Sequence, residues 1–560
     1  MDTNDLKVAL VHASVDWGAK EKNLAWLLDL NEEAAAAGAK IIVNTELATT
    51  GYSFACREEI ATLVETIPGP TTRKFGPIAE KYGCYIAIGL PEVDPRTGIF
   101  YNAAALVGPA GQIAGRCRKL APAYRENLWA ARGNLPVLVV QTEFGRVGLV
   151  VCADTYSYKP ARVAALKGAR ILLVPAVWPP EHHDPEKFWR ARATENGLHL
   201  LVCNRTGIDR DLDCSAATSY IIDGSGAIVK QVSSPAAAII YGTLPLAGGK
   251  VTGVSPAENL SRRRPSLYSD ISLDTYFLFN PVPMLGLPQV GEFTIAAVQY
   301  RPLPGRVADN VEKLLGLVDQ AVDKAAAAGT PLDIAVLPEL STTGIIAGRR
   351  AAEAGSEEIP GPITDRFAQK AAAKNIFIVL GLAERGGGCF YNSVVLVGPR
   401  GLTGCYRKVH LSRQDGNWAK AGDNVFPLFD LPFARLGLLA GDDLLFPESA
   451  ESLAKRGTDL ICTPAAWTNS KMCFIWEARM GEQAHLVVAN QWGERAGEVP
   501  TGRSAIYGYS RFQEKLLRTE AGTQGNDIII QRLDSRHTRE KRFLENIDYD
   551  TLLKTNAGQE

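Results

Sequence analysis

The chain repeats a long pattern of its own sequence, and this duplication constrains the fold more than any other feature. Five short sequence motifs of the first half, which we call words, recur in the same order in the second half. They contain the matching residue pairs Glu46 and Glu339, Pro68 and Pro360, Asn102 and Asn392, Lys119 and Lys408, and Trp178 and Trp467. The separation of matching residues drifts only from 293 to 289 positions. Solenoid repeats are roughly 20 to 50 residues long, so a period this large indicates two similar domains in tandem.

Each copy is long enough to form its own domain, since a chain of 560 residues exceeds what one hydrophobic core supports. We expect the first domain to span residues 1–279 and the second to span residues 293–560. The segment between them, residues 280–292, is rich in Pro and Gly and is predicted to be a linker. Arg262-Arg-Arg-Pro265 is echoed by Arg539-Glu-Lys-Arg542, so both copies are expected to end in a similar extension that packs on its neighbour.

Strand-like and helix-like runs alternate within each copy. In the first copy, residues 171–175 form a continuous apolar run typical of a buried strand, and residues 71–82 are predicted to form a helix. Residues 103–107 and 113–118 flank the turn Gly108-Pro-Ala-Gly111 and are predicted to form a hairpin. This order predicts a layered α/β domain with a mixed sheet.

Composition excludes several classes of partner. The formal net charge of −1 provides no electrostatic footprint for nucleic acid or an anionic membrane. The sequence has no run long enough to span a bilayer, and its start lacks the features of a signal peptide. The ten cysteines form no CxxC pair, which argues against structural zinc and against a disulfide framework. We therefore expect a cytoplasmic protein with reduced thiols.

Three reactive residue types of the first copy stand where an apolar strand gives way to a turn: Glu46, Lys119 and Cys152. The carboxyl ends of strands are where α/β sheets expose reactive groups. Each residue alone has a simpler interpretation, because a free cysteine is most often a small buried hydrophobe and a lone charge is most often solvated. Glu339 and Lys408 nevertheless recur inside the same words, although surface charges should diverge fastest between copies.

The words around these residues resemble a known family. Asn44-Thr-Glu-Leu-Ala-Thr-Thr-Gly-Tyr52, Cys117-Arg-Lys-Leu120 and Val151-Cys-Ala-Asp154 are similar, in order and separation, to the Glu, Lys and Cys motifs of the nitrilase superfamily of carbon–nitrogen hydrolases. The resemblance implies a four-layer α-β-β-α sandwich in each copy, a small-molecule substrate and no metal or cofactor. It also implies that the two copies pack as an intrachain pseudo-dimer, and a further homo-oligomer is compatible with this arrangement.

The same resemblance implies a role for each matching residue. Cys152 would be the nucleophile, Glu46 the general base, Lys119 the cation that stabilises the oxyanion, and Glu126 a second carboxylate. An amide carbonyl is a poor electrophile, so a base must take the thiol proton, and positive charge or N–H donors must stabilise the tetrahedral intermediate. The backbone N–H of Ala153 is the expected second donor. A thioester that water hydrolyses would follow.

The second copy departs from the pattern at the nucleophile. Gly441 falls where the first copy has Cys152, and Asp415 falls where it has Glu126. Glycine has no side chain and cannot form a covalent intermediate, so the second domain is predicted to be non-catalytic. It is expected to serve as a scaffold for the first domain, with an effector site around Gly441 as the alternative.

The substrate class is indicated by the residues after the nucleophile. True nitrilases usually continue with Trp-Glu, whereas this chain has Ala153 and Asp154, which favours amide or N-carbamoyl substrates. Tyr52, Tyr124 and Trp178, together with Ala153, are predicted to bind the substrate, because their loops should line the pocket.

Several alternatives remain open from the sequence. Nitrile hydrolysis or Cys-dependent acyl transfer could use the same residues, and a non-catalytic assembly protein is a further interpretation. The cluster Glu181-His-His-Asp-Pro-Glu186 is predicted to be a loop at the pocket rim and not a metal site, because adjacent histidines lack the spacing of helical zinc ligands.

Overall fold

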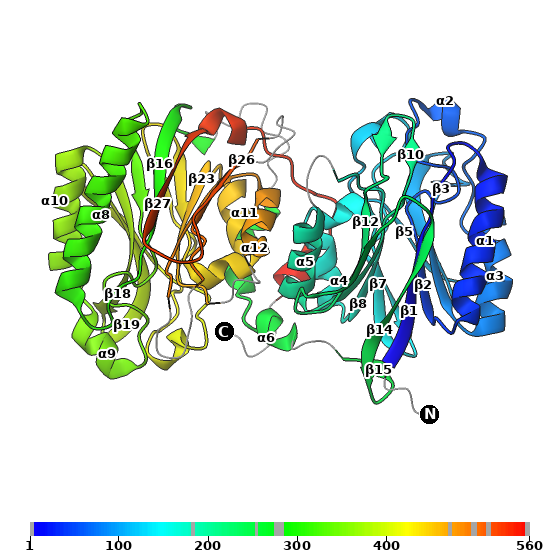
Figure 1. Cartoon of the computed structure of the whole chain (residues 1–560), viewed down its shortest axis with the longest axis horizontal. Coiled ribbons are helices and arrows are strands. Elements are labelled where there is room, and N and C mark those ends of the chain that lie inside the picture. Colours follow the sequence, from blue (N-terminus) through cyan, green and yellow to red (C-terminus); the bar gives the residue numbers. More distant parts are fainter. Residues whose placement is uncertain are drawn as a thin grey trace. The chain divides into compact units, whose positions relative to one another are not determined.

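The computed structural model describes residues 5–180, 185–252, 256–273, 285–468, 473–493, 501–510 and 517–554. Contacts divide the chain into two compact units, and Figure 1 labels many of their helices and strands. Unit 1 consists of Met1–Ser261 together with Leu544–Lys554, and unit 2 consists of Arg262–Phe543. Residues 181–184 of the predicted rim loop and residues 280–284 of the predicted linker lie outside the described residues. Over the described ranges, none of the helices combines the length and apolar character that crossing a membrane requires.

The first sheet of unit 1 has seven strands in the order β15-β14-β1-β2-β3-β4-β5. Their bounds are β1 Asp5–His12, β2 Ile41–Asn44, β3 Tyr85–Val93, β4 Phe100–Val107, β5 Ile113–Arg118, β14 Ala238–Ala247 and β15 Lys250–Val251. Strands β1, β2 and β3 are parallel, and the remaining neighbours are antiparallel. Strands β4 and β5 confirm the predicted hairpin.

Two helices cover the outer face of this sheet, α1 (Lys20–Ala36) and α3 (Pro70–Tyr82). Helix α3 starts at a proline, whose missing N–H costs nothing in the first turn of a helix. It ends at Gly83, whose φ of 58° is a left-handed conformation that glycine adopts without strain. Phe75 and Ala79 form the buried side of the helix. The short helix α2 spans Arg57–Ile60.

The second sheet of unit 1 has the order β13-β12-β9-β8-β7-β6. Its strands are β6 Leu138–Thr142, β7 Gly145–Leu149, β8 Ile171–Pro175, β9 His199–Cys203, β12 Thr218–Ile222 and β13 Ile228–Ser233. Strands β7, β8 and β9 are parallel. Every residue of β8 is buried, which confirms the interpretation of its apolar run.

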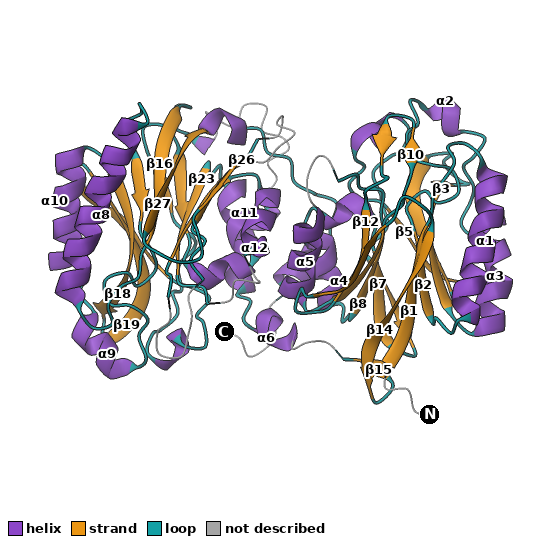
Figure 2. Cartoon of the chain, in the orientation of Figure 1, coloured by secondary structure: helices purple, strands orange, loops and turns teal. Residues whose placement is uncertain are grey.

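Helices also cover the outer face of the second sheet. These are α4 (Lys159–Leu166) and α5 (Pro185–Asn196), and α6 (Pro256–Ser261) contacts α5. The inner faces of the two sheets meet where β2 and β3 contact β8 and β9. Unit 1 is therefore an α-β-β-α sandwich, which Figure 2 shows as two strand layers between two helix layers. A small hairpin, β10 (Ile208–Asp209) and β11 (Leu212–Asp213), lies outside these sheets.

Unit 2 repeats this architecture. Its first sheet has the order β20-β19-β18-β17-β16-β27, with β16 Glu292–Gln299, β17 Ile334–Val336, β18 Phe377–Gly386, β19 Cys389–Gly398, β20 Gly401–Arg407 and β27 Asp527–Asp534. Its second sheet has the order β21-β22-β23-β24-β25-β26, with β21 Leu428–Asp430, β22 Arg435–Leu438, β23 Leu460–Ala465, β24 His485–Asn490, β25 Ala505–Gly508 and β26 Leu517–Glu520.

The helices of unit 2 complete four layers. Helices α8 (Val307–Ala327) and α10 (Pro362–Lys374) contact the first sheet, and α9 (Arg349–Gly355) contacts β18. Helices α11 (Pro447–Lys455) and α12 (Phe474–Ala478) follow strands of the second sheet. The predicted α-β-β-α sandwich is confirmed in each unit, and the pairing of the units as a pseudo-dimer stays a prediction.

Two segments at the ends of the copies belong, by their contacts, to the unit other than the one that precedes them in the sequence. Residues 262–273, which follow α6 directly, belong to unit 2. Residues 544–554, which contain the short helix α13 (Tyr549–Leu553), belong to unit 1. We call these segments arm 1 and arm 2.

Candidate active site

Four residues singled out in the sequence converge inside unit 1. Glu46 lies two residues after β2, and Lys119 follows β5 directly. Glu126 lies in a short 3-10 helix, Tyr124–Leu128, and Cys152 begins another, Cys152–Thr155, beyond β7. All four are buried, with 1%, 1%, 0% and 3% of their surface exposed, in the order Glu46, Lys119, Glu126, Cys152.

A single buried ammonium group joins two carboxylates. Nζ of Lys119 donates to Oε1 of Glu46 at 2.7 Å and to Oε1 of Glu126 at 2.6 Å. Burial alone would lower the pKa of Lys119, but the two carboxylates hold it well above its ordinary value. Burial, reinforced by the charge of Glu46, raises the pKa of Glu126 to about 7 against the opposing effect of Lys119. Glu126 therefore keeps its proton to a higher pH than an ordinary glutamate does.

The surroundings of Cys152 disfavour the thiolate form. Burial and the nearby carboxylate of Glu46 raise its pKa well above the ordinary value, and Lys119 only partly opposes this. Sγ donates to the carbonyl of Val177 at 3.5 Å. The backbone of Cys152 has a φ of 45°, a left-handed conformation that is rare for a residue with a side chain. Such strain persists where the surrounding structure imposes it, which is common at functional sites.

Asn102 positions both carboxylates, a role that the sequence did not reveal. Its Nδ2 donates to Oε1 of Glu46 at 2.7 Å and to Oε1 of Glu126 at 3.0 Å. The backbone N–H of Val177 donates to the other oxygen of Glu46 at 2.7 Å. Asn102 lies in the repeated word Phe100-Tyr-Asn102, so the duplication itself contained the signal.

Asn102→Ala is expected to lower both stability and activity. The change removes a donor to two buried carboxylates, and hydrogen bonds to charged groups contribute about 1.5–3 kcal/mol each. Asn392→Ala is the matched control, because Asn392 makes the same pair of contacts in unit 2, to Glu339 at 2.7 Å and Asp415 at 3.0 Å. Differential scanning calorimetry should show destabilisation in both variants, whereas only Asn102→Ala should reduce kcat. Equal loss of kcat in the two variants would contradict this assignment.

Asp154 holds the loop that carries Lys119. Its Oδ1 accepts from the backbone N–H groups of Leu120 and Ala121, both at 2.9 Å, and its Oδ2 accepts from Val151 at 3.2 Å. Burial raises the pKa of Asp154 to about 6, against the opposing effect of these donors. From the sequence, Asp154 indicated only a substrate class, and this structural role was not predicted.

Asp154→Asn should change how stability depends on pH. In the unfolded chain this carboxyl titrates near pH 4, so the folded protein retains its proton from about pH 4 to pH 6. The unfolding free energy of the wild type therefore falls as the pH rises through this window. The unfolding free energy of the wild type minus that of Asp154→Asn, measured by chemical denaturation, should fall by on the order of 3 kcal/mol between pH 4 and pH 7. Parallel pH curves would contradict the prediction.

The predicted substrate-binding residues have different surroundings. The ring of Tyr52 is buried with its centroid 5.6 Å from Nζ of Lys119, and its hydroxyl donates to the carbonyl of Ala123 at 3.1 Å. Tyr124 is 54% exposed, and its hydroxyl donates to Asp211.

The other two predicted substrate-binding residues are half-buried. Trp178 packs edge to face on Trp189 at 5.7 Å, and its backbone N–H donates to Asn204 at 3.0 Å. Ala153 follows the thiol in the 3-10 helix. Among the predicted substrate-binding residues, the structure brings the ring of Tyr52 to the buried cluster.

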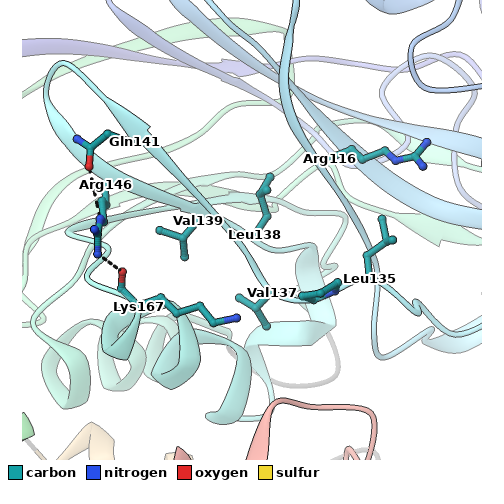
Figure 3. Close-up of a pocket in the computed structure, with 9 residues that line it drawn as sticks. Arg116, Leu135, Val137, Leu138, Val139, Gln141, Arg146 and Lys167 are labelled. Atoms are coloured by element: carbon teal, nitrogen blue, oxygen red, sulfur yellow. Dashed lines mark hydrogen bonds between the residues drawn. The ribbon is translucent and has the colours of Figure 1, made fainter. Parts of the chain in front are cut away.

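A separate pocket of about 810 Å³ lies along β6, the edge strand of the second sheet of unit 1. It is lined by Arg116, Leu135, Pro136, Val137, Leu138, Val139, Gln141, Arg146 and Lys167 (Figure 3). Arg146 donates to the carbonyl of Lys167 at 2.8 Å. No predicted site residue lines this pocket, so it is distinct from the cluster around Cys152. Within the part of the chain that the structure describes, no group of three or more His, Cys, Asp or Glu side chains is arranged to hold a metal.

Comparison with known proteins shows what these domains are related to. The family description "Carbon-nitrogen hydrolase" matches residues 7–252 and again residues 294–542. The chain belongs to the carbon–nitrogen hydrolase family. Its two matches make it a tandem member of the nitrilase superfamily, as predicted.

Relatives of this carbon–nitrogen hydrolase have names that refer to different substrates. A nitrilase of Pyrococcus abyssi is 36% identical over 210 residues, which cover 37% of this chain and 78% of that protein. A citrullinase of Francisella tularensis is 30% identical and covers 48% of this chain and 98% of that protein. An N-carbamoylputrescine amidase of Arabidopsis thaliana is 28% identical and covers 43% and 88%, respectively.

The second hydrolase-family unit retains the charged cluster around a glycine. Nζ of Lys408 donates to Glu339 at 2.7 Å and to Asp415 at 2.8 Å. Gly441 has a φ of 38°, close to the 45° of Cys152, so the two copies share the backbone conformation at this position. A Cβ atom built on Gly441 would lie 2.5 Å from Oε2 of Glu339. The carboxylate of Glu339 therefore borders the space that a side chain at position 441 would occupy.

Proposed function

We propose that unit 1 hydrolyses the carbon–nitrogen bond of an amide or N-carbamoyl compound through a thioester on Cys152. The observation that carries this proposal is the buried ammonium of Lys119, held between Glu46 and Glu126 beside a neutral thiol. A neutral thiol needs a base at the moment of attack, and a carboxylate in hydrogen-bonding range of the reacting atoms is suited to that task.

In the first half of the reaction, Cys152 attacks the carbonyl carbon while Glu46 takes the thiol proton. The developing oxyanion is stabilised by Lys119 and the backbone N–H of Ala153, and loss of one such donor typically costs about 3 kcal/mol. Collapse of the tetrahedral intermediate breaks the carbon–nitrogen bond. The protonated Glu46 gives its proton to the departing nitrogen, which leaves as ammonia or an amine.

In the second half, water attacks the thioester carbonyl. Glu46 takes a proton from the water. Glu126, whose pKa is raised to about 7, can gain or lose a proton and so change the net charge of the cluster. The carbon–sulfur bond then breaks, the thiolate recovers its proton from Glu46, and the acid is released. Lys119 remains protonated throughout, because Glu126 and the oxyanion of the intermediate supply negative charge beside it while Glu46 holds the transferred proton.

The amide and N-carbamoyl class is favoured by two observations. Ala153 and Asp154 follow the cysteine where true nitrilases usually carry Trp-Glu. Relatives named citrullinase and N-carbamoylputrescine amidase match 98% and 88% of their own lengths, which supports carbamoyl chemistry. Nitrile hydrolysis and acyl transfer to a nucleophile other than water are the competing reactions.

A substrate panel tests the proposal directly. The full chain is incubated with aliphatic amides, N-carbamoyl amines and nitriles of matched size, and released ammonia is measured. We expect turnover of amides or N-carbamoyl compounds, and acid quenching should trap an acyl group on the peptide that contains Cys152. Turnover of nitriles alone would overturn the substrate class. Transfer to added hydroxylamine with no hydrolysis in its absence would indicate an acyltransferase.

A further inference from the structure

The two arms dock on equivalent surfaces of different units. Arm 1 follows unit 1 in the sequence but packs in unit 2, and arm 2 follows the last strand of unit 2 but packs in unit 1. Arm 1 contacts α11, and arm 2 contacts α4, the matching helix of the other copy. Two arms and two matching surfaces raise the question of what assigns each arm to its unit.

One contact is shared by both arms and cannot discriminate between them. Lys167 directly follows α4 and pairs with Asp548 of arm 2 at 3.1 Å. Arg456 directly follows α11, at the matching position, and pairs with Asp270 of arm 1 at 3.5 Å. In each unit, a cation at the end of the helix binds an aspartate of the arm.

At a second contact, the helix residue that meets the arm is a cation in unit 1 and an anion in unit 2. At the start of α4, Nζ of Lys159 donates to the carbonyl of Leu544 at 2.9 Å and to the hydroxyl of Tyr549 at 3.0 Å. That hydroxyl donates to Glu545 at 3.0 Å. The matching residue of α11 is Glu448, which accepts from Arg263 of arm 1 at 2.9 Å.

The reversed position is buried in both units. Lys159 is 1% exposed, and the side chains of Glu448 and Arg263 are 0% and 3% exposed. A charge withheld from water is strongly disfavoured unless an opposite charge or hydrogen-bond partner meets it. Docking of arm 1 on unit 1 would bring Arg263 toward Lys159, and docking of arm 2 on unit 2 would bring Glu545 toward Glu448. Both exchanges oppose like charges.

Further contacts of arm 1 use residues that unit 1 lacks. Arg262 pairs with Asp442 at 2.6 Å, where unit 1 has Ala153. The hydroxyl of Tyr268 forms a 2.6 Å hydrogen bond with Nε2 of His410, where unit 1 has Ala121. The surface of unit 2 is therefore suited to a cationic arm.

We propose that the reversal of charge between Lys159 and Glu448 assigns each arm to the opposite copy. Specific pairing requires unfavourable alternatives as well as favourable contacts, and the reversed position supplies them. It follows that the partner of arm 1 is a unit with the acidic surface of the second copy, and not another first copy.

The test uses the full chain and measures hydrogen exchange of the two arms separately. Glu448→Lys should speed amide exchange in residues 262–273 at least tenfold and leave residues 544–554 unchanged. Adding Arg263→Glu to this variant should restore exchange in arm 1 to within threefold of the wild type. Lys159→Glu should have the converse effect, on arm 2 alone.

Two controls make the outcome decisive. Reversal of the exposed pair Arg532 and Glu292 in unit 2 should alter exchange in neither arm. Glu448→Gln removes the charge without adding another, so it should loosen arm 1 in the same direction and carries the test if Glu448→Lys does not fold. Unchanged exchange of arm 1 in the Glu448 variants, or no recovery in the double variant, would overturn the proposal.

Discussion

Cys152→Ala is expected to reduce turnover at least about 10⁴-fold while the protein stays folded, because removal of a nucleophile eliminates the covalent route. The side chain is small and makes one weak hydrogen bond, to Val177, so its loss should disturb packing little. Ammonia release measures the turnover, and circular dichroism with a thermal melt reports the folded state.

The control for this variant is another buried cysteine of unit 1. Cys203→Ala removes a thiol from β9 that donates to the carbonyl of Val11 at 3.1 Å, and it should retain full turnover apart from any loss of folded protein. Cys152→Gly should be more stable than Cys152→Ala by about 1 kcal/mol, because glycine adopts the φ of 45° without strain. Turnover that survives in Cys152→Ala would make the thiol structural.

Lys119→Met is expected to combine the largest loss of stability with loss of turnover. Glu46 and Glu126 would then face each other in the interior without their shared cation, and removing one partner of a buried ion pair typically costs about 3–5 kcal/mol. Methionine retains most of the volume, so the effect reports charge and not a cavity. Chemical denaturation monitored by hydrogen exchange in strands β2 and β5 measures the local stability.

Lys408→Met separates structure from chemistry. Lys408 joins Glu339 and Asp415 in unit 2 with the same geometry, so its removal should destabilise that unit by a similar amount. Turnover measured well below both melting temperatures should persist in Lys408→Met and vanish in Lys119→Met. Activity lost equally in both variants would show that the second cluster takes part in the chemistry or supports unit 1 directly.

Much of the fold was predictable because local signals agreed with the tertiary structure. The continuous apolar run 171–175 became a central strand buried on both faces, and Gly108-Pro-Ala-Gly111 marked a hairpin. The predicted helix 71–82 begins one residue earlier, at Pro70. The docking of the arms was only partly predictable. The sequence suggested that both copies end in an extension. The role of the opposite charges of Lys159 and Glu448 could not be predicted, because it depends on which arm contacts each residue.

The candidate site was also only partly predictable from the sequence. Repeated words directed attention to Glu46 and Lys119, and the structure brings both to Cys152. Asn102 was overlooked although its word was also repeated, because an amide has no obvious catalytic chemistry until its two carboxylate partners are seen. Tyr52 is buried and Tyr124 is exposed. The sequence could not distinguish them, because both are aromatic residues of predicted loops.

The geometry around Gly441 determines what a cysteine at that position would meet. Glu339 is fixed by Lys408, Asn392 and the backbone N–H of Ala466, so its carboxylate cannot easily withdraw from a new side chain at position 441. A Cβ atom there would lie 2.5 Å from this fixed oxygen. Gly441→Cys alone is therefore expected not to reproduce the arrangement of unit 1, and grafting that arrangement onto the second copy would demand coordinated changes at several residues.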